Sequence, residues 1–71
     1  MKTFSVLEVG AESLKDTLQA YNAMYALTSV LGCDWRVIGL PIWTNGRVSC
    51  FMPYSPTGPE DGRQYLVTEI D

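Results

Sequence analysis

IWTNGRVSC, residues 42–50, is the stretch that decides the fold. Asn45-Gly46 lies between two apolar runs. Asn-Gly in that setting is the strongest short-range signal of a β-hairpin, because a type I′ turn needs positive φ at both central positions. A two-residue loop at Asn45-Gly46 predicts this register: Thr44 with Arg47, Trp43 with Val48, Ile42 with Ser49, Pro41 with Cys50, and Leu40 with Phe51.

The remaining sequence predicts one long helix and two further strands. Residues 3–9 are rich in the β-branched and aromatic residues typical of strands. Residues 12–31 carry an apolar periodicity that predicts a helix, with a capping-box pattern at 13–16 and Gly32 in the left-handed position that ends it. After the Pro- and Gly-rich loop 55–62, residues 63–70 predict the last strand.

These elements predict a single α+β domain over residues 1–71, with the order β-α-β-β-β. The long helix is expected to pack on one face of a mainly antiparallel sheet of three or four strands. Parallel pairing of the first strand, through a crossover by the helix, stays open as an alternative.

Alternation along the hairpin sorts its residues into two sets, one for each face of the sheet. The uncharged set is expected to form the core: Trp35, Val37, Gly39, Pro41, Trp43, Val48, Cys50, Met52 and Tyr54. The other set is expected to form an exposed patch that binds a protein partner: Arg36, Ile38, Leu40, Ile42, Arg47 and Phe51. The alternative is a bulge at Pro41 that swaps the faces and breaks up this patch.

Composition excludes several classes of function. The net charge of −3 argues against binding to a nucleic-acid backbone, which needs clustered Lys and Arg. The chain has no His, and two distant Cys residues do not make a metal site. No run approaches the ~20 apolar residues of a membrane span. Glu8 and Glu12 interrupt the N-terminus too early for a signal peptide, so we expect a cytoplasmic protein with reduced thiols.

Catalysis and bound cofactors are not expected either. The chain has no histidine, the commonest acid–base group of enzymes. The adjacent carboxylates of Glu60 and Asp61 fall in a Gly/Pro loop typical of solvated turns. In the predicted register Cys33 and Cys50 are about 26 Å apart, so no disulfide should join them.

The sequence therefore favours a non-catalytic protein-interaction module, expected to form a homodimer. It fits a small inhibitor, of the kind that phages encode, of a larger cytoplasmic protein. The alternative is an oligomer that binds a nucleotide-like anion in a pocket between subunits. Aromatic and cationic side chains would line that pocket: Tyr21, Tyr25, Trp43 and Arg63.

Overall fold

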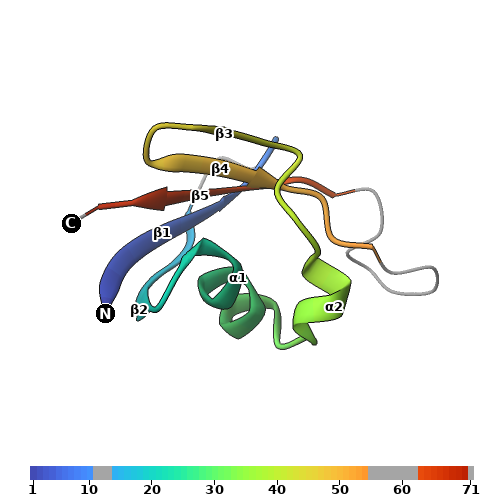
Figure 1. The fold of residues 1–71 in the computed structure, drawn as a ribbon, viewed down its shortest axis with the longest axis horizontal. Helices are drawn as coiled ribbons and strands as arrows, with labels where there is room; N and C mark the ends of the chain where they lie inside the picture. The colour runs from blue at the N-terminus through green and yellow to red at the C-terminus, as the bar shows by residue number, and fades with distance from the viewer. Residues whose placement is uncertain (11–13, 55–62, 71) are drawn as a thin grey trace.

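An antiparallel sheet of five strands carries two helices on one of its faces (Figure 1). The computed structural model describes residues 1–10, 14–54 and 63–70. Its elements are β1 (Lys2–Glu8), β2 (Leu14–Ala20), α1 (Ala23–Leu31), α2 (Trp35–Ile38), β3 (Trp43–Asn45), β4 (Val48–Phe51) and β5 (Tyr65–Glu69). The strand order is β2-β1-β5-β4-β3. The α+β class and the antiparallel pairing are confirmed, and parallel pairing of β1 is wrong, because β1 pairs antiparallel with both neighbours.

The long helix predicted over residues 12–31 is wrong in its first half. Residues 14–20 form β2, which pairs with β1 along its length. Leu18 and Ala20 lie on the covered side of this strand while Thr17 and Gln19 are exposed, which is the alternation of a strand. A helix would satisfy the backbone groups of this segment as well, so tertiary packing overrides its helical tendency: Ala20 is buried in the core and Leu18 packs against it.

The second half of the predicted helix is present as α1, and both of its ends are capped. Asn22 has extended backbone angles, φ −156° and ψ 177°, and its side chain accepts a hydrogen bond of 2.9 Å from the Tyr25 N–H. Gly32 ends the helix with φ 67°, donating its N–H to the Thr28 carbonyl. The prediction for Gly32 is therefore confirmed. No helix begins at the capping-box pattern 13–16, because residues 14–20 form β2. Ser13 itself lies outside the described residues.

The hairpin is present, but its register differs from the predicted one. The observed partners are Trp43 with Cys50, Thr44 with Ser49, and Asn45 with Val48, so the two-residue loop is Gly46-Arg47. Positive φ occurs in this loop only at Gly46, with φ 62°. That pattern fits a type II′ turn, in which Gly occupies the first central position.

Residues 35–38 are helical rather than the start of a strand. Asp34 is extended and its carboxylate accepts a hydrogen bond of 2.9 Å from the Arg36 N–H, so it caps the short helix α2. Gly39 follows with φ 69° and turns the chain toward β3. The predicted alternation, which placed Trp35 to Pro41 in the hairpin, is therefore wrong for these residues. The Asp34 cap satisfies the Arg36 N–H and lets a helical turn form instead.

The core lies between the sheet and the two helices, which cover the same face (Figure 1). Alternate residues of β1 and β5 supply its centre, where Val6 pairs directly with Val67 and both are fully buried. Phe51 of β4 extends it along the sheet, and Leu27 of α1 and Ile38 of α2 close it from the helical side. The predicted loop 55–62 lies outside the described residues, and the last strand is observed at Tyr65–Glu69 rather than 63–70.

Candidate functional site

The sheet has a second face, on the side away from α1 and α2, which we call the open face (Figure 1). The pairing places these described residues on it: Thr3, Ser5, Leu7, Val9, Thr17, Gln19, Trp43, Asn45, Val48, Cys50, Gln64, Leu66, Thr68 and Ile70. One row crosses four strands as successive Cα partners, running from Leu7 through Leu66 and Cys50 to Trp43. The open face therefore has an apolar row through its middle.

The exposure of this row rises toward its edge. Cys50 is 1% exposed, Leu7 and Leu66 are half-buried, and Trp43 on the edge strand is 46% exposed. Val9 and Ile70 lie beyond the strand ends of β1 and β5 and are also about half exposed. The apolar row is therefore largely buried among its own neighbours, and half-exposed apolar side chains lie around it.

The charged residues of the sheet gather on the other face. Lys2 and Glu8 share the side of β1 that carries the buried Phe4 and Val6, and Asp16 and Glu69 pair with these core residues. Two ion pairs form there, Lys2 with Glu69 at 3.2 Å and Arg63 with Glu8 at 3.6 Å. Lys15 falls at the register shift of β2 and has no Cα partner in β1. No residue of the open face as defined above carries a charge.

The predicted assignment of the two hairpin faces is therefore reversed. Phe51 and Ile38, expected at a partner surface, are each 2% exposed and belong to the core. Trp43 and Cys50, expected in the core, lie on the open face. The hairpin sequence alone cannot show which of its faces is buried, because both faces are apolar. The neighbouring strands decide, since Tyr65 pairs with Phe51 and joins it to the core.

Leu7 and Leu66 were not singled out from the sequence. Each occupies an alternating position in a strand whose other side is strongly apolar, and this alternation is the signal that marks them. Their place beside Cys50 depends on the strand order, which local sequence does not determine.

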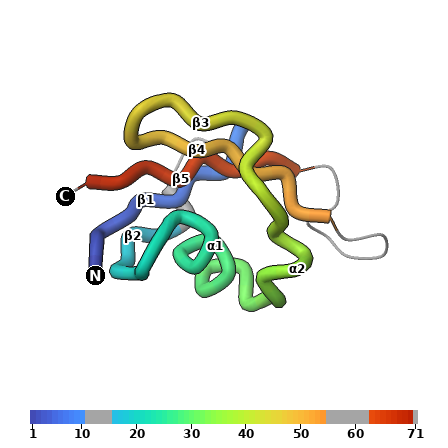
Figure 2. The backbone as a smooth tube through the Cα atoms, in the orientation of Figure 1, coloured from blue at the N-terminus to red at the C-terminus, as the bar shows by residue number. Residues whose placement is uncertain are grey.

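Four exposed apolar side chains lie where α2 meets the segments on either side of the hairpin. We call this group the corner surface: Trp35 (55% exposed), Leu40 (86%), Ile42 (49%) and Tyr54 (68%). The segments are joined by a hydrogen bond of 2.7 Å from the Tyr54 N–H to the Val37 carbonyl. Figure 2 shows the backbone rising from α2 toward β3 past the segment that follows β4.

Arg36 stands beside this corner surface and is held in place by Asp34. Its Nε and Nη2 donate to the two carboxylate oxygens at 3.1 and 2.9 Å. The hydrogen bond from this guanidinium lowers the pKa of Asp34 to about 2. Four of the predicted partner-binding residues are exposed. Arg36 lies in α2, Leu40 and Ile42 lie between α2 and β3, and Arg47 lies in the hairpin loop.

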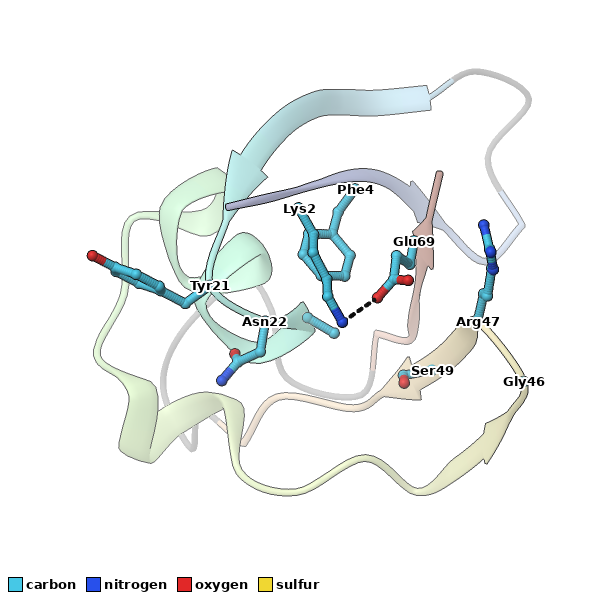
Figure 3. Close-up of a pocket in the computed structure, with 9 residues that line it drawn as sticks. Lys2, Phe4, Tyr21, Asn22, Gly46, Arg47, Ser49 and Glu69 are labelled. Carbon is cyan, nitrogen blue, oxygen red and sulfur yellow. Dashed lines mark ion pairs between the residues drawn. The ribbon is translucent and has the colours of Figure 1, made fainter. Parts of the chain in front are cut away.

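A separate pocket of about 140 Å³ opens on the helical side of the sheet, near the start of α1. Its lining includes the cations Lys2 and Arg47 and the hydroxyl of Ser49. Figure 3 shows the Lys2 ammonium directed at Glu69, and the ring of Tyr21 turned away from the pocket. Tyr21 makes an edge-to-face contact with Tyr25 instead, with ring centroids 6.3 Å apart.

The residues predicted for anion binding are not brought together within one chain. Tyr21 follows Ala20, which pairs with Lys2 at one end of β1, whereas Arg63 binds Glu8 at the other end. Six residue steps of a strand separate these ends by about 20 Å. Trp43 lies on the open face, across the sheet from the helices. Of the four residues, Tyr21 and Tyr25 are in direct contact with each other.

Groups that could perform chemistry are few in the described ranges. No cluster of three or more His, Cys, Asp or Glu side chains able to hold a metal occurs there. No disulfide joins Cys33 and Cys50, and burial raises the pKa of the Cys50 thiol, which disfavours the reactive thiolate. Glu60 and Asp61 lie outside the described residues. No helix among the described residues is long and apolar enough to cross a membrane.

Comparison of the chain with models of protein families, with curated proteins and with solved structures finds no match. The corner surface and the open face of this chain each carry several large apolar side chains that are exposed.

Proposed function

We propose that this chain is a non-catalytic protein-interaction module that binds a larger protein through the corner surface, as a small inhibitor or adaptor. The observation that carries the proposal is the exposure of Leu40, of which 86% is open to solvent, among three further large apolar side chains. Burying apolar surface stabilises a complex by about 25 cal/mol per Å² before the costs of association. The corner surface therefore offers a partner more exposed apolar area to bury than a typical region of the surface does.

The composition and rigidity of the corner surface support this role. Trp and Tyr are enriched among the residues that dominate binding energy, and Arg is the third member of that group. Trp35 and Arg36 are adjacent in α2, and the Tyr54 N–H donates to the Val37 carbonyl of the same helix, so all three types are present. The bidentate pair with Asp34 orders the Arg36 side chain before binding, which lowers the entropy lost on association.

A photocrosslinking experiment tests this proposal in the cells that produce the protein. A photoreactive amino acid at position 40 should yield one discrete adduct, and the same substitution at Asp16, exposed in β2, provides the matched control. Excess unlabelled wild-type chain should compete the adduct away, whereas a folded Leu40→Glu variant should not. No adduct at position 40 beyond that at position 16 would contradict the proposal.

A second candidate function is supported by the pair of Tyr21 and Tyr25. Tyr21 is 74% exposed and borders the pocket that holds Lys2 and Arg47, although its ring is turned away from that pocket (Figure 3). An aromatic anion such as a nucleotide would bind if a second subunit completed the pocket, with the Tyr21 ring of one copy stacking on a base held by the cations of the other. A ligand that binds only the folded state raises its thermal midpoint. A rise with adenosine monophosphate, lost in Tyr21→Ala, would favour this candidate over the interaction module.

A further inference from the structure

The distribution of charge over the sheet points to a second interaction surface, distinct from the corner surface. Lys2, Glu8, Asp16 and Glu69 all lie on the face that carries the helices. They line its margins, where the helices leave room for ion pairs such as Lys2 with Glu69. The open face has none of these charges, although all of its residues except Cys50 are at least partly exposed.

Half of the open-face residues are Thr, Ser, Asn or Gln, as expected for the solvated face of an antiparallel sheet, but none of them is charged. The residues on either side of the apolar row are therefore mostly uncharged polar side chains. They include Ser5, Thr68 and Val48, which are Cα partners in a second row that runs parallel to the first. Such a surface matches the centre of a protein interface, from which charged residues are depleted.

The same lack of charge indicates which partner fits. A twofold interface brings each surface patch against the same patch of the second copy. In a chain of net charge −3, a charged face would meet its own sign across such an interface. The open face avoids this repulsion, and it offers a different protein no charged residue for complementary pairing or for steering.

The shape of the surface is compatible with the same partner. Two sheets can pack face to face at about 10 Å, with side chains of both inner faces interdigitating. Trp43, Val9 and Ile70 project as half-exposed apolar side chains around the packed row of Leu7 and Leu66. Self-association would cover all of them at once and would leave the corner surface at Leu40 outside the contact.

We propose that the open face is the self-association surface of this protein, and that two copies pack sheet to sheet as a twofold-symmetric homodimer. The surface lies on the opposite side of the hairpin from the patch expected from sequence. It is independent of the corner surface, so that either proposal can fail while the other stands.

Light scattering during size exclusion tests this proposal, over loading concentrations from about 1 µM to about 1 mM. The wild-type mass should rise toward twice the 7.9 kDa of one chain. Ser5→Lys should weaken the dimer about 100-fold or more, because the ammonium reaches water in the monomer and loses it in the dimer. Thr68→Lys, at the partner position on β5, should do the same and serves if the first variant does not fold.

Leu40→Lys is the matched control, since it introduces the same charge at an exposed apolar residue off the open face. It should dimerise as the wild type does. A wild-type chain that stays at 7.9 kDa throughout would overturn the proposal. So would a folded Ser5→Lys variant that dimerises with unchanged affinity, or a dimer that Leu40→Lys disrupts and Ser5→Lys does not.

Discussion

A single side chain, that of Asn22, marks the boundary between strand and helix in the first third of the molecule. The carbonyl of Asn22 accepts the first helical bond from Ala26, and its side chain accepts from Tyr25. The side-chain bond satisfies the Tyr25 N–H, one of the backbone donors that a helix start otherwise leaves without a partner. In the sequence, this Asn lies within a continuous apolar periodicity, so its role as a cap becomes visible only once residues 14–20 are known to form a strand.

Replacing Asn22 with Ala should therefore lower the free energy of unfolding by about 1 kcal/mol. For a domain of this length that corresponds to a fall in thermal midpoint of roughly 4–8 °C. Chemical denaturation followed by circular dichroism measures the change. Asn22→Asp is the control, because it keeps the acceptor oxygen and adds a negative charge at the positive end of the helix dipole. An Ala variant as stable as the Asp variant would show that the cap contributes nothing.

At the scale of elements, the sequence predicted what depends on local signals and missed what depends on distant partners. The turn residue Gly46 indicated the hairpin correctly, and Gly32 indicated the helix end. The register was missed because only Gly46 takes positive φ, which moves the loop by one residue. Leu14 and Leu18 are four positions apart, a spacing that suits one face of a helix and that also occurs within a strand. The pairing with β1 identifies the strand, with Leu18 opposite Phe4 and Leu14 opposite Leu7 on the two sides of a register shift.

The same ambiguity limited the prediction of the candidate sites. Exposure at Leu40 and Ile42 follows from their place between a short helix and an edge strand, and both had been expected at a partner surface. The open face could not be assigned, because its row joins Leu7 to Trp43 through two intervening strands. Those two residues are 36 positions apart in the sequence, and no local pattern relates them.

The Thr17→Ala substitution distinguishes the two readings of β2 by the sign of its effect. Thr17 is exposed in the monomer, so at protein concentrations below dimerisation the change acts mainly through intrinsic propensity. In a strand, losing the β-branched side chain should destabilise the fold by up to about 1 kcal/mol. In a helix, the same change should stabilise it by a few tenths of a kcal/mol. Urea denaturation should therefore show a lower midpoint for the variant, and a higher midpoint would contradict the strand.

At the scale of the whole molecule, the protein separates charge from apolar surface. Its ion pairs border the helical side of the sheet, the open face is uncharged, and the corner surface carries exposed Leu, Ile, Trp and Tyr side chains. A chain of net charge −3 remains mutually repulsive in solution except where two uncharged surfaces meet. We therefore expect the uncharged and apolar surfaces to bind other molecules, and the net negative charge to oppose nonspecific association.

The dissociation constant of the wild-type dimer at low and high salt tests this account most directly. Sedimentation equilibrium at about 50 mM and about 1 M NaCl spans Debye lengths from roughly 14 to 3 Å. An uncharged interface predicts a dimer that holds or tightens at high salt, because net repulsion between two acidic chains is screened. A dimer that weakens about tenfold or more at high salt would show that ion pairs hold it together. That result, or the absence of any dimer, would contradict the assignment of the open face.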